Sequence, residues 1–161
     1  MKRMTGLFAS IAAGAILFAG AALAGEVTVK HAQGETKLPD VPQKVITFDL
    51  SSLDTLDTLG VKVAGVPTIK MQDYLSKYAA DDYIKVGTLF EPDYEAVNAA
   101  QPDLIIVGGR SAAKYAELAK IAPTIDLTAD AANFVKSSED NIRTLANIFG
   151  KDKEAEDALT K

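Results

Sequence analysis

The sequence predicts an α/β fold, a mostly parallel sheet with helices on both faces. Three observations predict it. Short β-branched, apolar segments alternate with helical patterns, the loops between them are short, and residues 103–107 (DLIIV) have no polar face. A strand that is apolar on both faces is typical of a parallel sheet that helices cover on both sides.

The chain begins with an expected export signal. Lys2 and Arg3 precede an uncharged run over residues 7–23, and Ala22-Leu23-Ala24 predicts cleavage before Gly25. The alternative is a transmembrane anchor. The run is only about as long as the shortest spanning helices, is diluted by Gly and Ala, and ends in the cleavage pattern, which favours a cleaved signal.

Composition excludes several classes of partner and site. The 161 residues carry a formal charge of −5 and contain no cysteine. Removal of residues 1–24 would leave 15 basic and 22 acidic side chains, a formal charge of −7. Such a surface repels nucleic acid and anionic lipid. Without cysteine, this sequence has no lipid-modified Cys, disulfide or thiolate metal site, so we expect a free periplasmic protein with no membrane insertion after cleavage.

The first expected elements are a hairpin and a strand–helix unit. The hairpin turns at Gln33-Gly34-Glu35 and is followed by a buried strand over residues 44–48. A helix over residues 49–59 comes next, because its leucines share one face. Either Ser51 or Ser52 can cap that helix, since a serine side chain accepts a hydrogen bond from a free amide at a helix start.

The rest of the chain repeats this unit. Further strands are expected at residues 61–66, 83–86, 103–107 and 124–127, and helices at 71–83 (in part), 92–100 (opened by Pro92), 112–122 and 133–161 (interrupted by Gly150). Ligands of such sheets bind beyond the carboxyl ends of the strands. The expected site is therefore built from the loops after Phe48, Val86, Val107 and Leu127.

Four segments of the sequence, taken in order, resemble one known family. They are residues 86–95 (VGTLFEPDYE), 101–110 (QPDLIIVGGR), 121–124 (IAPT) and 147–151 (NIFGK). Each alone is a weak signal, but the ordered set is similar to the class III substrate-binding proteins of ABC importers. Those proteins have two α/β lobes joined by one long, stiff helix, with the ligand between the lobes.

The resemblance implies a division of the chain into three parts. Residues 1–24 are the signal peptide, residues 25–150 the N-terminal ligand-binding lobe, and residues 151–161 the start of the inter-lobe helix. The second lobe is missing from this sequence. The implied function is capture of an iron(III)–siderophore complex in the periplasm and its delivery to the permease dimer of an inner-membrane ABC transporter.

The Gly-Gly-Arg segment looks closest to the branch that binds ferric catecholate siderophores, where an arginine of this loop points into the cleft. The resemblance assigns that role to Arg110. The chemistry agrees, because a guanidinium offers several donors to anionic oxygens and can lie against an aromatic face. Phe90 stands where related proteins can place a basic residue, and it could stack on the ligand. Leu50 and Ser51, after the first buried strand, also face the expected cleft.

The resemblance also implies docking on the permease through a carboxylate. The matching residue is Glu95, with Glu91 as the nearby alternative. No cofactor and no protein metal site are expected, since His31 is a lone histidine with no other His and no Cys near it.

Two other interpretations compete with this one. The ligand could be another metal chelate, such as haem, a hydroxamate siderophore or cobalamin. The protein could also be an enzyme on a doubly wound fold, with Gly108-Gly109-Arg110-Ser111 as a phosphate loop. The second interpretation is remote, because the sequence lacks the Gly-x-Gly-x-x-Gly pattern, the Gly-Lys-Ser/Thr ending and a nucleophile elbow.

Overall fold

The computed structural model describes residues 25–160. The predicted signal peptide over residues 1–24 lies outside the described residues. None of the helices described between residues 25 and 160 is long and apolar enough to cross a membrane.

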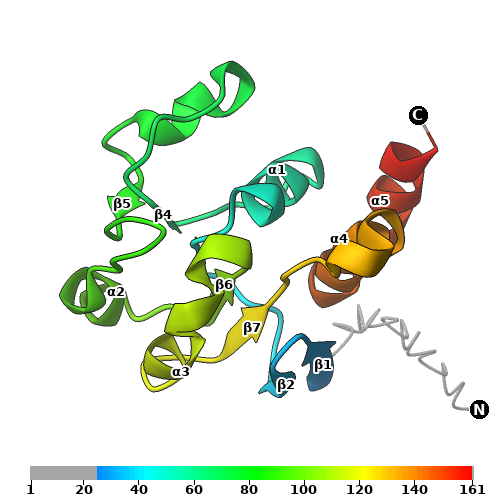
Figure 1. Cartoon of the computed structure of the whole chain (residues 1–161), viewed down its shortest axis with the longest axis horizontal. Helices are drawn as coiled ribbons and strands as arrows, with labels where there is room; N and C mark the ends of the chain where they lie inside the picture. The colour runs from blue at the N-terminus through cyan, green and yellow to red at the C-terminus, as the bar shows by residue number, and fades with distance from the viewer. Residues whose placement is uncertain (1–24, 161) are drawn as a thin grey trace, which may run out of the picture.

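Five parallel strands form the central sheet, in the order β5-β4-β3-β6-β7 (Figure 1). Their bounds are β3 Val45–Thr47, β4 Gly65–Val66, β5 Ile84–Lys85, β6 Leu104–Val107 and β7 Thr124–Asp126. The chain builds the sheet outward from β3 in one direction and then returns to build from β6 in the other. The predicted parallel sheet is confirmed, although β4 and β5 are shorter than expected.

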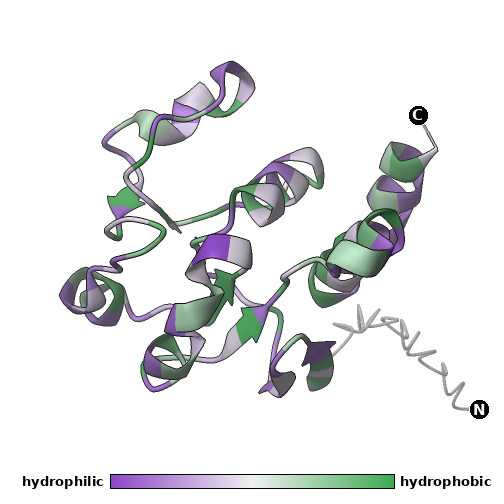
Figure 2. Cartoon of the chain, viewed as in Figure 1, coloured by the Kyte–Doolittle hydropathy of each residue, from purple (hydrophilic) through white to green (hydrophobic). Residues whose placement is uncertain are grey.

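Helices cover both faces of the sheet, as predicted. Side chains of β6 alternate between two apolar clusters, because successive residues of a strand point to opposite faces. Leu104 and Ile106 pack in the cluster that holds Leu53 of α1 (Leu50–Thr58). Ile105 and Val107 pack in the other cluster, which holds residues of α2 (Tyr94–Ala100) and α3 (Tyr115–Leu118). The strand β6 is accordingly coloured hydrophobic in Figure 2.

The N-terminal caps of α1 and α2 differ from the prediction. The N-cap of α1 is Asp49, whose carboxylate accepts from the amide of Ser52, so neither Ser51 nor Ser52 is the cap. The N-cap of α2 is Asp93, so Pro92 precedes the helix and does not open it. An aspartate one residue before a helix accepts amide hydrogen bonds more readily than a residue already inside it.

Two segments expected as α-helices are tighter or shorter. Within residues 71–83 only a 3-10 helix forms, η1 Asp73–Ala79. The expected helix over residues 112–122 consists of a 3-10 helix, η2 Gly109–Lys114, followed by one turn of α3. The segment after β6 therefore begins directly with tight helical turns, which keep Arg110 close to the end of the strand.

The predicted hairpin is present and lies beside β7 (Figure 1). It consists of β1 Val27–His31 and β2 Gly34–Leu38, so its turn comes one residue earlier than predicted and Gly34 already pairs with His31. The amide of Ala32 donates to the carbonyl of Asp126 at 3.0 Å, which joins the hairpin to the end of β7.

The last stretch of the described chain, from Ala131 onward, is helical, as predicted. The short 3-10 helix η3 Ala131–Asn133 leads into α4 Phe134–Phe149, and α5 Asp152–Leu159 follows. Gly150 separates α4 from α5 with a left-handed φ of 65°. The predicted interruption at this glycine is confirmed. That α5 begins a helix joining two lobes stays a prediction.

Candidate ligand-binding site

The loops after β3 and β6 meet at the point where the strand order reverses. Beyond the carboxyl ends of these two neighbouring strands, the chain departs to opposite sides of the sheet. The reversal leaves a crevice between the loops, which is where open α/β sheets bind ligands. Two of the four loops predicted to form the site, those after Phe48 and Val107, therefore lie side by side.

A pocket of 240 Å³ occupies this crevice. Its lining comes from the two switch-point loops and from the tip of the loop after β5, namely Phe48, Asp49, Leu50, Ser51, Leu89, Gly108, Gly109 and Arg110. Three predicted site residues, Leu50, Ser51 and Arg110, line the pocket together. Phe90 does not line it, although its neighbour Leu89 does.

Arg110 is the pocket's cationic side chain, and it is exposed. No other side chain or backbone group within residues 25–160 accepts a hydrogen bond from its guanidinium or forms an ion pair with it. The next residue is held firmly by contrast. The buried hydroxyl of Ser111 donates to the carbonyl of Phe48 at 3.1 Å and accepts from the amide of Gly108 at 3.0 Å. A fixed backbone thus carries an unpaired guanidinium.

The two glycines before Arg110 have different roles. Gly109 adopts a left-handed φ of 51°, a conformation that favours glycine. Gly108 has an extended backbone, but a Cβ there would lie 2.9 Å from Cγ of Asp49. The first glycine therefore allows the two loops to approach, and the second allows the turn that presents Arg110.

Phe90 lies at the tip of a tightly closed loop after β5. Gly87 starts the loop at a φ of 90°, and the amide of Thr88 donates to the carbonyl of Glu91 at 2.9 Å. The hydroxyl of Thr88 accepts from the amides of Phe90 and Glu91. The loop buries Leu89 and leaves the Phe90 ring 60% exposed, beside the pocket.

A larger groove of 430 Å³ adjoins the pocket and shares Asp49, Ser51 and Gly109 with it. It runs between α1 and the start of α4, and Phe134, which is 62% exposed, forms part of its lining. Phe134 was not among the predicted site residues. A signal was present, because Phe134 shares a helical face with Ser138 and Ile142 at a spacing of four residues.

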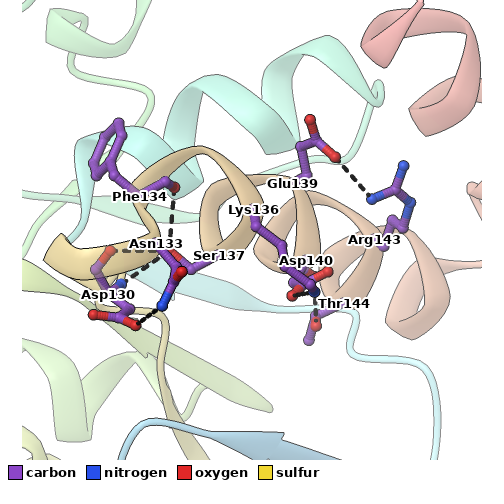
Figure 3. A network of polar contacts seen from close by, with 9 residues as sticks. All are labelled: Asp130, Asn133, Phe134, Lys136, Ser137, Glu139, Asp140, Arg143 and Thr144. Atoms are coloured by element: carbon purple, nitrogen blue, oxygen red, sulfur yellow. Dashed lines mark hydrogen bonds and ion pairs between the residues drawn. The ribbon is translucent and has the colours of Figure 1, made fainter.

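The start of α4 is fixed by polar contacts (Figure 3). The hydroxyl of Ser137 donates to the carbonyl of Phe134 at 3.1 Å and accepts from the amide of Asp130. Hydrogen bonds from Asn133 and the Ala132 amide hold the pKa of Asp130 below its ordinary value. The Phe134 ring points away from this network.

The charge along these two hollows is mixed. Among their described lining residues, Arg110 is cationic, and Asp49 and Asp54 are acidic. Neighbouring groups of the chain already act on both carboxylates. Asp49 accepts from the amide and hydroxyl of Ser52 at 2.8 and 2.7 Å. Burial, and then repulsion from Asp57, raises the pKa of Asp54. An anionic ligand would therefore find its favourable contact at Arg110.

The two candidate docking carboxylates lie outside both hollows. Glu95 is in the first turn of α2, and Glu91 is in the loop before it. Both are exposed, and neither side chain bonds to another described residue. They are available to a partner on the α2 side of the switch point.

Comparison with known proteins identifies the family. Residues 45–161 match the family described as periplasmic binding protein. The chain belongs to this family. The predicted resemblance to class III binding proteins of the siderophore branch is confirmed, and the matched relatives are binding proteins.

Among the relatives of this periplasmic binding protein chain, the petrobactin-binding protein YclQ of Bacillus subtilis is 44% identical over 138 residues. That match covers 83% of this chain and 44% of the relative. The crystal structure of YclQ superposes with a TM-score of 0.81. The catecholate-siderophore binding protein VctP of Vibrio cholerae gives 0.80 at 36% identity, over 84% of this chain and 49% of VctP. The Fe(3+)-citrate-binding protein YfmC of Bacillus subtilis is 33% identical over 80% of this chain and 42% of its own length. The chain thus spans less than half the length of these relatives.

Proposed function

We propose that this chain is the N-terminal lobe of an exported binding protein that captures an iron(III)–siderophore complex for an ABC importer. One observation carries the proposal. Arg110, unpaired within the described chain, lines a pocket at the switch point of a parallel sheet. The relatives YclQ, a petrobactin-binding protein, and VctP, a catecholate-siderophore binding protein, support the same ligand class.

The proposed ligand is a ferric catecholate, because its chemistry matches three exposed side chains. A tris-catecholate complex of iron(III) is anionic, and a guanidinium donates to anionic oxygens from a planar fork. Phe90 and Phe134, both more than half exposed, offer aromatic faces on which catecholate rings can stack. Leu50 and Ser51 would contact the ligand from the loop after β3.

A second lobe completes the site in this proposal. The chain covers 44% of YclQ, and the pocket is lined by loops of this lobe alone. Residues 25–150 are then the first lobe, and α5 begins the helix that leads to the second. One lobe offers half of a cleft, so the chain alone should bind a chelate more weakly than a two-lobe form.

Export and delivery form the remaining part of the proposal. Residues 1–24 are proposed as a cleaved signal, which would leave a free periplasmic protein, since this sequence has no cysteine to carry a lipid. Glu95, with Glu91 as the alternative, is proposed to meet arginines of the permease dimer. Loss of uptake, with chelate binding retained, is the expected result of Glu95→Gln in cells that depend on the importer.

The ligand assignment can be tested by NMR titration of this chain with a gallium(III) catecholate siderophore. Gallium(III) is a diamagnetic substitute for iron(III), so weak binding remains visible as shifts of backbone amide signals. We expect the Gly108, Gly109 and Arg110 amides to shift. Arg110→Ala should weaken binding about tenfold or more, since loss of one charged contact costs more than about 1.4 kcal/mol.

Arg143→Ala is the matched control, because Arg143 is the other arginine of residues 25–160, pairs with Glu139 and Glu156, and lines neither the pocket nor the groove. It should bind like the unchanged chain. Gallium citrate, which is anionic without aromatic rings, and a neutral gallium hydroxamate separate the competing chelate classes. Preferential binding of either one, or equal loss in both arginine variants, would contradict the catecholate assignment.

A further inference from the structure

The N-terminal hairpin is joined to the Arg110 loop through a buried carboxylate. Asp126, at the end of β7, is 3% exposed and forms no ion pair within residues 25–160. Its Oδ1 accepts from the amide and the hydroxyl of Thr128, at 2.9 and 2.6 Å. Its Oδ2 accepts from the side-chain amide of Gln33, at 2.9 Å. A buried charge of this kind is tolerated when hydrogen bonds satisfy its oxygens.

This carboxylate reaches the ligand loop through one further hydrogen bond. The hydroxyl of Thr128, which donates to Asp126, accepts from the backbone amide of Gly109 at 2.9 Å. A continuous path therefore runs from Gln33 in the hairpin through Asp126 and Thr128 to the residue before Arg110. Gly109 donates to Thr128 and Thr128 donates to Asp126, so these two bonds run in one direction and strengthen each other, while Gln33 donates to the other oxygen of the same carboxylate.

Gln33 also holds the other end of the loop. Its side-chain amide donates to the carbonyl of Ala112 at 3.0 Å, in addition to its bond with Asp126. Both amide hydrogens are thus used, one toward each side of Arg110. Together with the buried Ser111, these contacts fasten the residues that flank Arg110, although neither Gln33 nor Asp126 lines the pocket or the adjoining groove.

We infer that Gln33 and Asp126 are positioning residues, which preorganise the Arg110 loop for its ligand without touching that ligand. The inference rests on the proposed function for its ligand and on the hydrogen bonds above for its mechanism. Fixing a loop before binding reduces the entropy that binding must overcome. The hairpin, which contributes no lining residue to either hollow, would then set part of the affinity.

The first test needs no ligand. Gln33→Glu preserves the shape of the side chain but removes both donated hydrogen bonds. Gln43→Glu is the matched control, because it makes the same charge change where the glutamine side chain bonds only the nearby Val41 carbonyl. Amide hydrogen exchange at Gly109 and Thr128 should accelerate about tenfold in Gln33→Glu and stay unchanged in Gln43→Glu. Equal exchange rates in the two variants would overturn the inference.

A second pair of variants tests the path at its centre. Thr128→Val removes the hydroxyl at nearly equal volume, and Thr128→Ser retains it. Exchange at Gly109 should be fast in the valine variant and restored to the original rate in the serine variant. The inference is wrong if serine and valine give the same rate.

The ligand titration then separates this inference from the proposed function. Gln33→Glu should bind the gallium catecholate several-fold more weakly than Gln43→Glu, which carries the same net charge. If Arg110→Ala weakens binding but Gln33→Glu and Gln43→Glu bind equally, the positioning role fails and the proposed function stands. If Arg110→Ala has no effect, the proposed function fails, whatever the exchange rates show.

Discussion

At the scale of single residues, Arg110 depends on two glycines that solve different problems. A Gly-Gly pair allows a sharp turn, because glycine has no Cβ. In the structure each glycine has its own role. Gly109 adopts a left-handed conformation, and Gly108 lies so close to Asp49 that a side chain would not fit. The second role follows only from the approach of a loop that lies about sixty positions earlier in the chain.

We expect Gly108→Ala to destabilise the chain by about 1–3 kcal/mol, the usual cost of inserting a methyl group into a packed site. The new Cβ would lie 2.9 Å from Cγ of the Asp49 carboxylate, which is too close for two carbon atoms. Urea unfolding measures the change. In an Asp49→Ser background the carboxylate is gone, so the same substitution should cost clearly less. Equal costs in both backgrounds would show that Asp49 is not the obstacle.

At the scale of elements, the N-termini of α1 and α2 hold the loops of the site in place. Each helix begins at an aspartate that accepts an amide hydrogen bond, Asp49 from Ser52 and Asp93 from Ala96. The predicted serine caps were wrong, because Ser51 and Ser52 already belong to the first turn of α1. The cap of α1 also lines the pocket, so helix stability and site shape depend on one side chain.

Asp49→Ala should therefore reduce the free energy of unfolding by about 1 kcal/mol, the typical value of a lost N-cap. It should also weaken binding of the gallium catecholate, since the loop after β3 would lose its anchor. Asp93→Ala is the comparison, with a similar loss of stability and no loss of binding. Chemical denaturation and the NMR titration measure the two effects. Unchanged binding in Asp49→Ala would mean that the cap serves the helix alone.

At the scale of the whole molecule, the hairpin and the sheet are joined through His31. Its Nδ1 accepts from the amide of Gln33, and its Nε2 donates to the hydroxyl of Thr36, which donates to the carbonyl of Thr124 at 2.7 Å. This arrangement requires a neutral imidazole. His31 was expected to have no role as a metal ligand, and the structure gives it a place in the contact between hairpin and sheet.

Acid should accordingly weaken the folded chain through His31. Burial lowers the pKa of this imidazole, and the attraction of Asp126 opposes the shift without reversing it. The unfolded chain therefore binds a proton more readily than the folded one, so this contribution is complete above about pH 6.5 and is lost as the pH falls toward the folded pKa. Thermal unfolding between pH 7.5 and 5 measures the effect.

The variant His31→Gln has no titratable group at position 31. Its melting temperature should decline less between pH 7.5 and 5 than that of the unchanged chain. Tyr115, whose ring centroid lies 5.4 Å from that of His31, remains in both proteins, and the attraction of Asp126 is removed together with the imidazole, so the comparison measures the net effect of His31. Parallel pH curves would assign the acid sensitivity to other groups.

The residue pattern was enough to predict the parallel sheet, its helices on two faces and the loop that carries Arg110. These features follow from hydrophobic periodicity and glycine positions, which act within one element or between neighbours in the chain. The folded arrangement was needed to show that Phe134 lines a groove with α1 and that Gln33 bonds to Asp126, 93 positions away. Such contacts depend on strand order and on the way elements pack, because a polar side chain finds its partner only after distant segments are brought together.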